Sequence, residues 1–567
     1  MSAMTATQAP MINVQVEGEW QQFPKGTRLI EACMKSGHFV PHYCYHPKLS
    51  SPGNCRMCLV ELGMPKMTPE RKPILGADGR PEIAWSPRPV ISCATDISEG
   101  MAVRTSSPLV EECRKGVMEF LLINHPLDCP ICDQAGECRL QEFSVQYGKG
   151  ESRFLEEKVK KPKRVDIGPR IVLDDERCIM CSRCVRFMQE IAKDDVLGFV
   201  NRGGHTTLTV YPGRKLDNNY SLNTVDICPV GALTSKDFRF SMRVWFLRET
   251  KSIDVTCGTG VNILIGSREN IIHRITPREN DFVNSCWMPD SHRLNFHDVN
   301  SEARLRDPRI KGDELPATWP KAVQAAAEQL QANPKATAMI ASARMTNEEL
   351  FLARRLANGL GIELFDVLPR PQEGDGFLIS PDGNPNTSGA MLIGVATGKL
   401  PEIASGVASG TIKSLLVLGE DALECGISES DLAGLDSLVA TAILPNKTTA
   451  NATVLLPAAS WAEKRGSMIN VKGRLQRLNQ AISSPGSARS EWEILRDLLQ
   501  ATGGSNGIQT IDELFKQIAA EYSALEGLSL SRIGDLGIDL SARLNTANKA
   551  IANSEPTPAS HTSPACD

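Results

Sequence analysis

Seventeen cysteines occur in the chain, and thirteen of them precede residue 229. Eleven of these cysteines and one histidine fall into three groups of four, and each group contains a Cys-x-x-Cys step. The first set is Cys44, Cys55, Cys58 and Cys93; the second set is His125, Cys129, Cys132 and Cys138; the third set is Cys178, Cys181, Cys184 and Cys228. Groups of four thiolates hold iron–sulfur clusters, so the spacing indicates electron-transfer chemistry.

The first set has the spacing of a [2Fe–2S] centre. Ten residues separate Cys44 from Cys55, two separate Cys55 from Cys58, and Cys93 follows at a distance. This spacing differs from the plant type, which has four residues between the first two ligands. Gly53 and the small side chains around it favour a loop that wraps closely around a cluster. The alternative is a zinc site with four cysteine ligands.

The second and third sets predict two further metal centres. Three residues separate His125 from its Cys-x-x-Cys step, and a zinc site of the Cys₃His type is the alternative to a cluster. An imidazole on one iron would change the charge and potential of a cluster, as in Rieske centres. The third set joins Cys-x₂-Cys-x₂-Cys to a remote Cys-Pro at Cys228, the ferredoxin pattern of one [4Fe–4S] cluster, again with zinc as the alternative. Nearby Arg177, Arg183 and Arg186 either offset the cluster charge or form an ordinary solvated face.

The composition limits the class of protein. The chain has 567 residues, a net charge of −5 and 41% hydrophobic residues, which predicts several globular domains and no nucleic-acid partner. No apolar run reaches the roughly 18 residues that span a bilayer, and the first ten residues predict no secretory signal. Thiols of an unexported protein are not expected to form structural disulfides. Cys33 and Cys113, on apolar helical faces, are interpreted as core thiols, and Cys425 and Cys566 as incidental.

The elements around the sets follow from local patterns. Residues 11–35 predict strands and then a short helix that ends at Gly37. The segment 63–89, rich in Pro, Lys and Gly, predicts a long surface loop between Cys58 and Cys93.

A helix is expected over residues 106–125, with Ser106 or Ser107 as its cap and Pro108 in its first turn. The side chains expected to share its apolar face are Val110, Cys113, Val117, Phe120 and Leu121. A connector is expected over 156–164, a helix from residue 184, and the entry into a second helix over 227–233.

Strand and helix patterns alternate after about residue 250. The strands expected there are 336–343, 362–367 and 414–419, and an amphipathic helix over 347–361 ends at a glycine. This alternation predicts a large α/β domain with a mainly parallel sheet. The segment from residue 551, rich in Pro, Ser and Thr, is expected to be disordered.

The three ordered sets resemble those of the large iron–sulfur subunits of respiratory complex I, the NADH-quinone oxidoreductase. SIDVTCGTGVNI from residue 252 and ATVLLPAASWAEKRG from residue 452 are similar to the molybdopterin-oxidoreductase-like part of the same family. The resemblance implies a multidomain α+β and α/β fold. Its parts are a [2Fe–2S] ferredoxin-like β-grasp domain (11–105), a His(Cys)₃-ligated [4Fe–4S] domain (106–148), a [4Fe–4S] ferredoxin-like domain (149–245), a degenerate molybdopterin-oxidoreductase-like domain (250–500) and a C-terminal extension (501–567).

The same resemblance implies cofactors and partners. The first set is expected to hold one [2Fe–2S] cluster, and the second and third sets one [4Fe–4S] cluster each. Such a chain relays electrons from a flavin-containing, NADH-oxidising partner toward quinone, in a complex coupled to ion translocation. It is expected at the cytoplasmic face of the cell membrane, attached through the other peripheral-arm subunits and, indirectly, the membrane arm.

Two departures from the family pattern bear on function. Some bacterial members carry a fourth cluster, whose ligands would fall at Asp254, Cys257, Val261 and Cys286; since two of the four are not cysteine, no such cluster is expected. The 63–89 insertion lengthens a gap that is shorter in other members. A catalytic or diaphorase-type subunit of an NAD-linked formate dehydrogenase or hydrogenase is the alternative. No Cys occurs from 287 to 424, and only Cys257, Cys286, Cys425 and Cys566 remain as ligands for such an enzyme, so no molybdopterin is expected. The third hypothesis, a zinc scaffold without redox function, is distinguished by its lack of colour.

Overall fold

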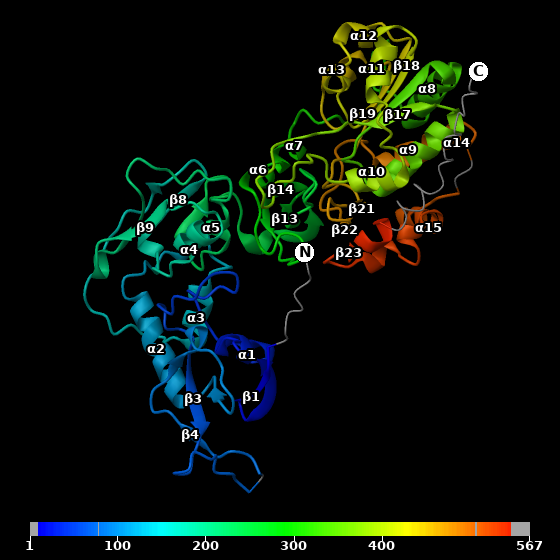
Figure 1. Cartoon of the computed structure of the whole chain (residues 1–567). Helices are drawn as coiled ribbons and strands as arrows, with labels where there is room; N and C mark the ends of the chain where they lie inside the picture. Colours follow the sequence, from blue (N-terminus) through cyan, green and yellow to red (C-terminus); the bar gives the residue numbers. More distant parts are fainter. Residues whose placement is uncertain (1–8, 78, 505–506, 546–567) are drawn as a thin grey trace, which may run out of the picture. The chain divides into compact units, whose positions relative to one another are not determined.

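A computed structural model describes residues 9–77, 79–504 and 507–545. The chain forms two compact units, unit 1 (Met1–Phe246) and unit 2 (Leu247–Asp567), which are described separately (Figure 1). The predicted disordered segment from residue 551, with Cys566, lies outside the described residues. None of the helices in the described ranges is long and apolar enough to cross a membrane.

Unit 1 begins with a six-stranded sheet in the order β2-β1-β6-β3-β4, with β5 paired to β3. Its elements are β1 (Met11–Val16), β2 (Glu19–Pro24), α1 (Leu29–Lys35), β3 (Leu59–Pro65), β4 (Ile83–Trp85), β5 (Val90–Ile91) and β6 (Ala102–Arg104). Strand β1 pairs with β6 in parallel and with β2 in antiparallel orientation. Alternate residues Ile12, Val14 and Val16 point into a small core under α1, as the period of a half-buried strand requires. The predicted strands and short helix are confirmed.

The prediction of a long surface loop over 63–89 is only partly correct. The two ends of the segment lie in the antiparallel pair of β3 and β4, and between them two isolated bridges join Met67 to Pro73 and Leu75 to Pro81. Proline has no N–H to donate to a neighbouring strand, which explains why the strand pairing is interrupted. The Pro-rich composition therefore gave no indication of strands in this segment. The segment is exposed along most of its length, as expected.

The middle of unit 1 contains α2 (Pro108–Leu122) and α3 (Arg139–Tyr147). The Ser107 side chain accepts a hydrogen bond from the Val110 amide and caps α2, as predicted. The predicted apolar face is wrong, because the buried positions of α2 are Val110, Arg114 and Met118, while Phe120 is 79% exposed.

Unit 1 ends in a ferredoxin-like part built from short elements. They are β7 (Val165–Asp166), β8 (Ile171–Leu173), α4 (Arg183–Glu190), β9 (Leu197–Val200), β10 (Thr207–Val210), α5 (Asn223–Asp226) and β11 (Leu233–Ser235). The helix expected from residue 184 is α4. The helix expected to start within 227–233 does not form; this stretch turns into β11, which pairs with β8.

Unit 2 opens with an antiparallel sheet of β12 (Arg248–Ile253), β13 (Asn262–Arg268) and β14 (Ile271–Pro277), followed by α6 (Asp290–Arg293) and α7 (Phe296–Val299). Its main sheet has six strands in the order β15-β20-β19-β18-β16-β17, all parallel except β15. These strands are β15 (Arg309–Ile310), β16 (Thr337–Ala341), β17 (Leu364–Val367), β18 (Ser414–Leu418), β19 (Ser437–Ala442) and β20 (Val454–Pro457). The predicted α/β domain with a mainly parallel sheet is confirmed.

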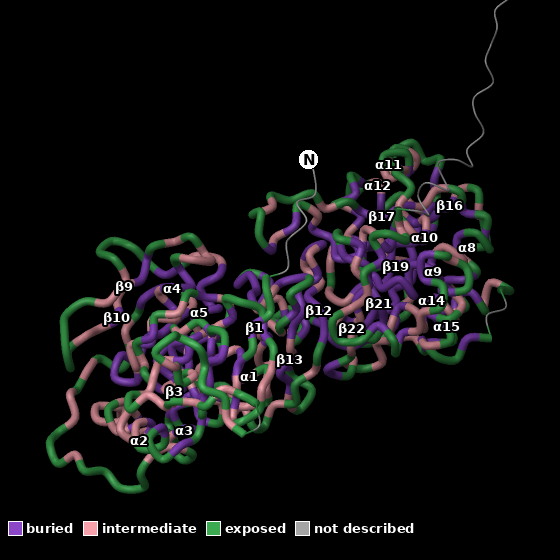
Figure 2. Tube along the Cα trace, turned by 60° about the horizontal axis from the view of Figure 1, so that its bottom comes forward, coloured by how far each residue is buried: buried purple, intermediate pink, exposed green. Residues whose placement is uncertain are grey.

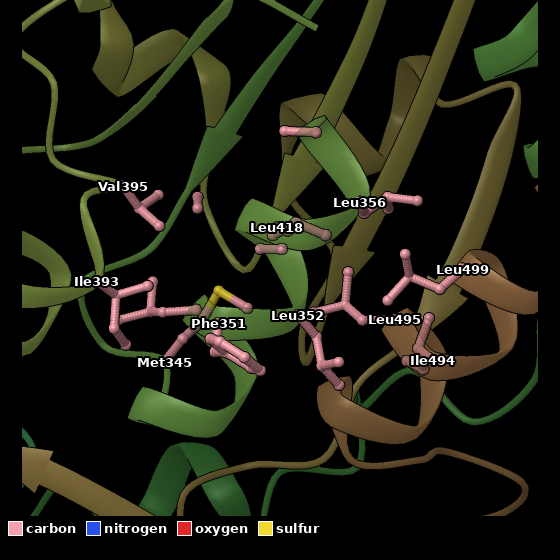
Figure 3. Packing of buried hydrophobic residues seen from close by; sticks show 14 of the residues in the cluster. Met345, Phe351, Leu352, Leu356, Ile393, Val395, Leu418, Ile494, Leu495 and Leu499 are labelled. Atoms are coloured by element: carbon pink, nitrogen blue, oxygen red, sulfur yellow. The ribbon is translucent and has the colours of Figure 1, made fainter. Parts of the chain in front are cut away.

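Helices cover both faces of this sheet, and Figure 2 shows buried residues concentrated along its strands. Its helices are α8 (Trp319–Ala332), α9 (Asn347–Leu360), α10 (Thr387–Ile393), α11 (Leu400–Ala408), α12 (Glu429–Ala433), α13 (Lys447–Asn451), α14 (Glu491–Ala501) and α15 (Ile511–Glu521). On one face, Phe351 of α9 and Leu495 of α14 belong to the largest apolar core (Figure 3). A small third sheet contains β21 (Gly466–Ile469), β22 (Arg474–Leu478) and β23 (Ile538–Asp539).

Candidate metal centres

The four thiols of the first set converge beside the core of the N-terminal sheet. The Cys44 amide lies 3.5 Å from Cys55 Sγ, and the Cys44 and Cys58 thiols both interact with that of Cys93. All but the half-buried Cys55 are buried. The hydrogen bonds that these thiols share lower the pKa of Cys44 and Cys58 and raise the pKa of Cys55 and Cys93.

The loop that carries the first set is tightly curved. Gly53 and Arg56 have left-handed backbone conformations, with φ of 63° and 62°. The Ser92 hydroxyl donates to the Cys58 carbonyl over 2.7 Å and joins the loop to the segment that supplies Cys93. Glycine takes such a conformation without steric cost, which explains its position in this loop.

The three cysteines of the second set lie close enough to interact with one another. Cys132 and Cys138 are buried, whereas Cys129 is exposed and His125 is half-buried. Burial, opposed by the nearby Asp128 carboxylate, lowers the pKa of His125 to about 4, so the ring is neutral at neutral pH and can act as a ligand.

The third set lines one small cavity. All four cysteines line it, together with the apolar residues Phe199, Leu208 and Leu233. Burial, assisted by the neighbouring Cys228 thiol, raises the pKa of Cys181 to about 11. Met180 and Ser182, between the ligand positions, are non-glycine residues with φ of 53° and 59°. Strain of this kind persists where the surroundings fix the loop, as at ligand sites.

The loops of the second and third sets touch. A Cβ added at Gly231, three residues after Cys228, would lie 2.4 Å from Cys132 Sγ. The Arg139 amide, next to Cys138, donates to the Pro229 carbonyl over 3.1 Å. Glycine at 231 therefore lets the Cys-Pro segment of one set pass directly over a sulfur of the other.

Several residues that surround the sets were not predicted from the sequence. Asp128 accepts hydrogen bonds from Arg177 and Lys163 at 2.8 and 3.0 Å, and these bonds outweigh burial and lower its pKa to about 2. The Tyr43 ring, one residue before Cys44, packs 5.3 Å from that of Phe143. The sequence places Tyr43 next to the ligand Cys44, but it does not show that the tyrosine ring packs against Phe143.

The predicted arginines are not on a solvated face. Arg177 and Arg186 are only 4% and 7% exposed, and Arg183 is half-buried. Cys33 is buried, as expected of a core thiol, and Cys113 is half-buried, so its assignment to the core is only partly correct. Cys425 is buried in a second apolar core of unit 2.

The positions of a fourth cluster have other contacts. Asp254 Oδ2 lies 2.8 Å from His292 Nδ1, Cys257 Sγ accepts from the Ser380 amide at 3.5 Å, and Val261 belongs to an apolar core. Cys286 is half-buried. Across the described ranges, no three His, Cys, Asp or Glu side chains are arranged to hold a single metal ion.

Unit 2 has a cavity of about 410 Å³ at the carboxyl ends of its parallel strands, where ligands bind in open α/β sheets. Its walls include Ser342, Gly419, Ser460 and Lys464, but no Cys or His among the described residues. Lys464 pairs with the buried carboxylates Glu349 and Glu491 at 2.8 and 3.2 Å.

Five family models match successive parts of the chain. They are the 2Fe-2S iron-sulfur cluster binding domain (9–108), the NADH-ubiquinone oxidoreductase-G iron-sulfur binding region (114–153), the ferredoxin-like domain of NADH-quinone oxidoreductase subunit 3 (168–234), the NADH-ubiquinone oxidoreductase NDSU1/NuoG-like 4Fe-4S domain (247–297) and molybdopterin oxidoreductase (381–501). This order confirms the fold class expected from the sequence.

Curated relatives point the same way. A subunit of the NADH-quinone oxidoreductase of Rickettsia felis is 40% identical over 360 residues, which is 63% of this chain and 50% of that protein. The NADH-ubiquinone oxidoreductase 78 kDa subunit of Neurospora crassa is 41% identical over 365 residues, 63% of this chain and 46% of that protein. The chain spans about half the length of the curated relatives it matches. In sequence and in its iron–sulfur domains, the chain resembles the large iron–sulfur subunits of NADH-quinone oxidoreductase.

Proposed function

We propose that the chain is an iron–sulfur electron-relay subunit of NADH-quinone oxidoreductase. The observation that carries the proposal is the packing of three four-ligand sets within unit 1, where the loops of neighbouring sets are in direct contact. An isolated metal site needs no neighbour, whereas electron transfer requires centres close together.

The residues fit one binuclear and two tetranuclear clusters. Cys44, Cys55, Cys58 and Cys93 would hold [2Fe–2S]; His125, Cys129, Cys132 and Cys138 would hold one [4Fe–4S]; Cys178, Cys181, Cys184 and Cys228 would hold the other. Bound there, the clusters would each take up and release one electron at a time. The chain would contribute thiolate ligands, a cavity lined by apolar side chains and backbone curvature that keeps the ligands facing inward.

The domain assignment follows the sets: 11–105, 106–148 and 149–245 for the three centres, 250–500 for a degenerate molybdopterin-oxidoreductase-like domain and 501–567 for an extension. The contacts of Asp254, Cys257 and Val261 favour three clusters without a fourth, although a 4Fe-4S family model covers 247–297. For the domain that contains the unit 2 cavity we propose a structural role without molybdopterin, although the molybdopterin oxidoreductase family model covers 381–501. The curated relatives do not favour a formate dehydrogenase or hydrogenase function.

The partners would be a flavin-containing, NADH-oxidising subunit and other peripheral-arm subunits. The chain would reach the cytoplasmic face of the membrane through them, and the complex would couple electron transfer to ion translocation.

Iron and acid-labile sulfide per chain test the proposal, measured on anaerobically purified full-length protein together with low-temperature EPR. Three clusters predict about ten iron atoms and as many sulfides, and Cys228→Ser should lose about four of each. Cys113→Ser, which removes a thiol outside the sets, is the matched control and should lose none. About fourteen iron atoms would reveal a fourth cluster, and zinc without sulfide would refute the relay.

A further inference from the structure

Two arginines of α4, Arg183 and Arg186, join the loops of the first and third sets. Arg186 Nη2 donates to the carbonyls of Cys44 at 2.5 Å and of Cys181 at 3.4 Å, and its Nη1 donates to the Ser50 carbonyl. The Arg186 guanidinium thus donates to the backbone carbonyl of one ligand in each set, Cys44 in the first set and Cys181 in the third. The planar fork of arginine suits this role, since it offers five donors in fixed directions.

Arg183 makes the same kind of connection one turn earlier. Its Nη2 donates to the Tyr45 carbonyl, next to Cys44, and its Nη1 donates to the Ile227 carbonyl over 3.2 Å, next to Cys228. Asn54 adds a third link, from its Nδ2 to the Met180 carbonyl over 3.1 Å. The two ligand loops are therefore held together mainly from one helix.

The charges of these two arginines are not matched by a carboxylate. Neither Arg183 nor Arg186 forms an ion pair in the described ranges, although Glu190 lies on the same helix; that carboxylate accepts from the Ser50 amide at 2.8 Å. Arg177, by contrast, pairs with Asp128 and Asp174 at 2.8 and 3.3 Å. A buried charge needs compensation, and in proteins it is paired or bound to a metal site.

Cysteines of both sets lie beside these arginines and can carry negative charge as thiolates. Arg183 lines the cavity of the third set together with Cys181 and Cys228, and Arg186 contacts the Cys44 carbonyl of the first set. Four thiolates around iron and sulfide carry net negative charge, and reduction adds one more. A cation fixed beside both sets would stabilise the reduced form of each.

We infer that Arg183 and Arg186 are shared positioning residues of the first and third sets, which fix the two ligand loops against each other and raise the reduction potentials of both centres. The inference rests on the proposed function. A purely structural role would not change the reduction potentials in a fixed direction. Here, substitution of either arginine should shift the potentials of the first and third centres in the same direction.

The test is a redox titration followed by EPR on the full-length, cluster-loaded chain. Arg186→Gln and Arg183→Gln should each lower the potentials of the [2Fe–2S] signal and of one [4Fe–4S] signal, and leave the other tetranuclear signal in place. Arg186→Lys keeps the charge but loses the fork, so its potentials should stay near the wild type while the magnetic interaction between the two centres weakens. Arg214→Gln, which breaks an exposed pair with Asp194 in the same part of unit 1, is the matched control and should shift neither.

The outcomes separate the two proposals. Wild-type protein without iron and sulfide would refute the relay itself. Wild-type protein with three centres, but with unchanged potentials in both glutamine variants, would refute only the role of the arginines. An Arg186→Lys shift as large as that of Arg186→Gln would refute charge compensation. If one glutamine variant fails to retain its clusters, the other variant and Arg186→Lys decide by the same criteria.

Discussion

The two units are stabilised in different ways. Unit 2 has a large apolar core between its parallel sheet and helices such as α9 and α14, and its buried charges are mostly paired, as in Arg304–Glu463. Unit 1 has a small core under its N-terminal sheet, and beyond it the interior contains the ligand sets and buried arginines such as Arg186. Unit 2 thus derives its stability from apolar burial, whereas we expect much of unit 1 to derive it from bound clusters.

Removal of iron should have the largest effect of the changes considered. It should destabilise unit 1, which ends at Phe246, and leave unit 2 folded. Because ligands come from distant segments, the free energy of cluster binding is also free energy of folding. Chelation under reducing conditions should therefore abolish hydrogen-exchange protection over 106–246 and leave β16 to β20 protected. Equal loss of protection in both units, or loss in neither, would contradict the comparison.

Substitution of Gly231 should affect one cluster among three. Gly231→Ala would place a methyl group 2.4 Å from Cys132 Sγ, closer than atoms can approach, so the second set should lose its iron while the first set keeps its own. Iron analysis and EPR measure this directly. Gly116→Ala is the matched control, since that position in α2 has nothing within 4 Å, and the helix should gain up to about 1 kcal/mol. An intact second cluster in Gly231→Ala would show that the loops separate easily.

The ligand sets and the parallel sheet were both inferred from local patterns; the sheet is confirmed, and the ligand sets stay predictions. Cysteine spacing is itself the signal of a cluster, and a run such as β18 is apolar at nearly every position because both of its faces are buried. The face of α2 was mispredicted because Arg114 is buried, where it donates to the Leu59 carbonyl over 3.1 Å, while Phe120 is exposed.

The links between sets could not be predicted from the sequence. Charged residues are usually exposed, so Arg186 gave no sign that its donors reach backbone of two loops more than a hundred residues apart. The sequence around Gly231 indicates only a turn, and it does not show that Cys132 lies beside this glycine. Long-range contacts of this kind leave no period in a single sequence.

Truncation of the unit 2 core should leave the clusters intact. Phe351 is 1% exposed and lies in the core shown in Figure 3, so Phe351→Ala should lower the free energy of unfolding of unit 2 by about 3–5 kcal/mol. Urea unfolding followed by hydrogen exchange in β18 measures the loss, and iron content should not change. Leu315→Ala, at a position 79% exposed, is the control and should have little effect. Iron loss in Phe351→Ala would mean that unit 1 depends on the core of unit 2.

A smaller effect, confined to unit 2, should depend on pH. Burial raises the pKa of Glu348 at the start of α9 to about 7, although the amide and hydroxyl of Ser467 donate to its carboxylate at 2.9 and 2.8 Å. The folded state therefore binds a proton more tightly than the unfolded state, whose glutamate titrates near 4.3. Unit 2 should lose stability as the pH rises from about 4 to about 7 and stay constant above that.

Glu348→Gln should remove this dependence, because the amide cannot ionise and its oxygen can still accept from Ser467. We expect the variant to match the wild type near pH 4 and to be more stable at pH 8 by on the order of 3 kcal/mol, as measured by urea unfolding of unit 2 at both pH values. The exposed Glu402→Gln provides the control, with the same difference at both pH values. Equal stabilisation of Glu348→Gln at pH 4 and pH 8 would show that the pKa of Glu348 does not differ between the folded and unfolded states, because the hydrogen bonds from Ser467 offset the effect of burial.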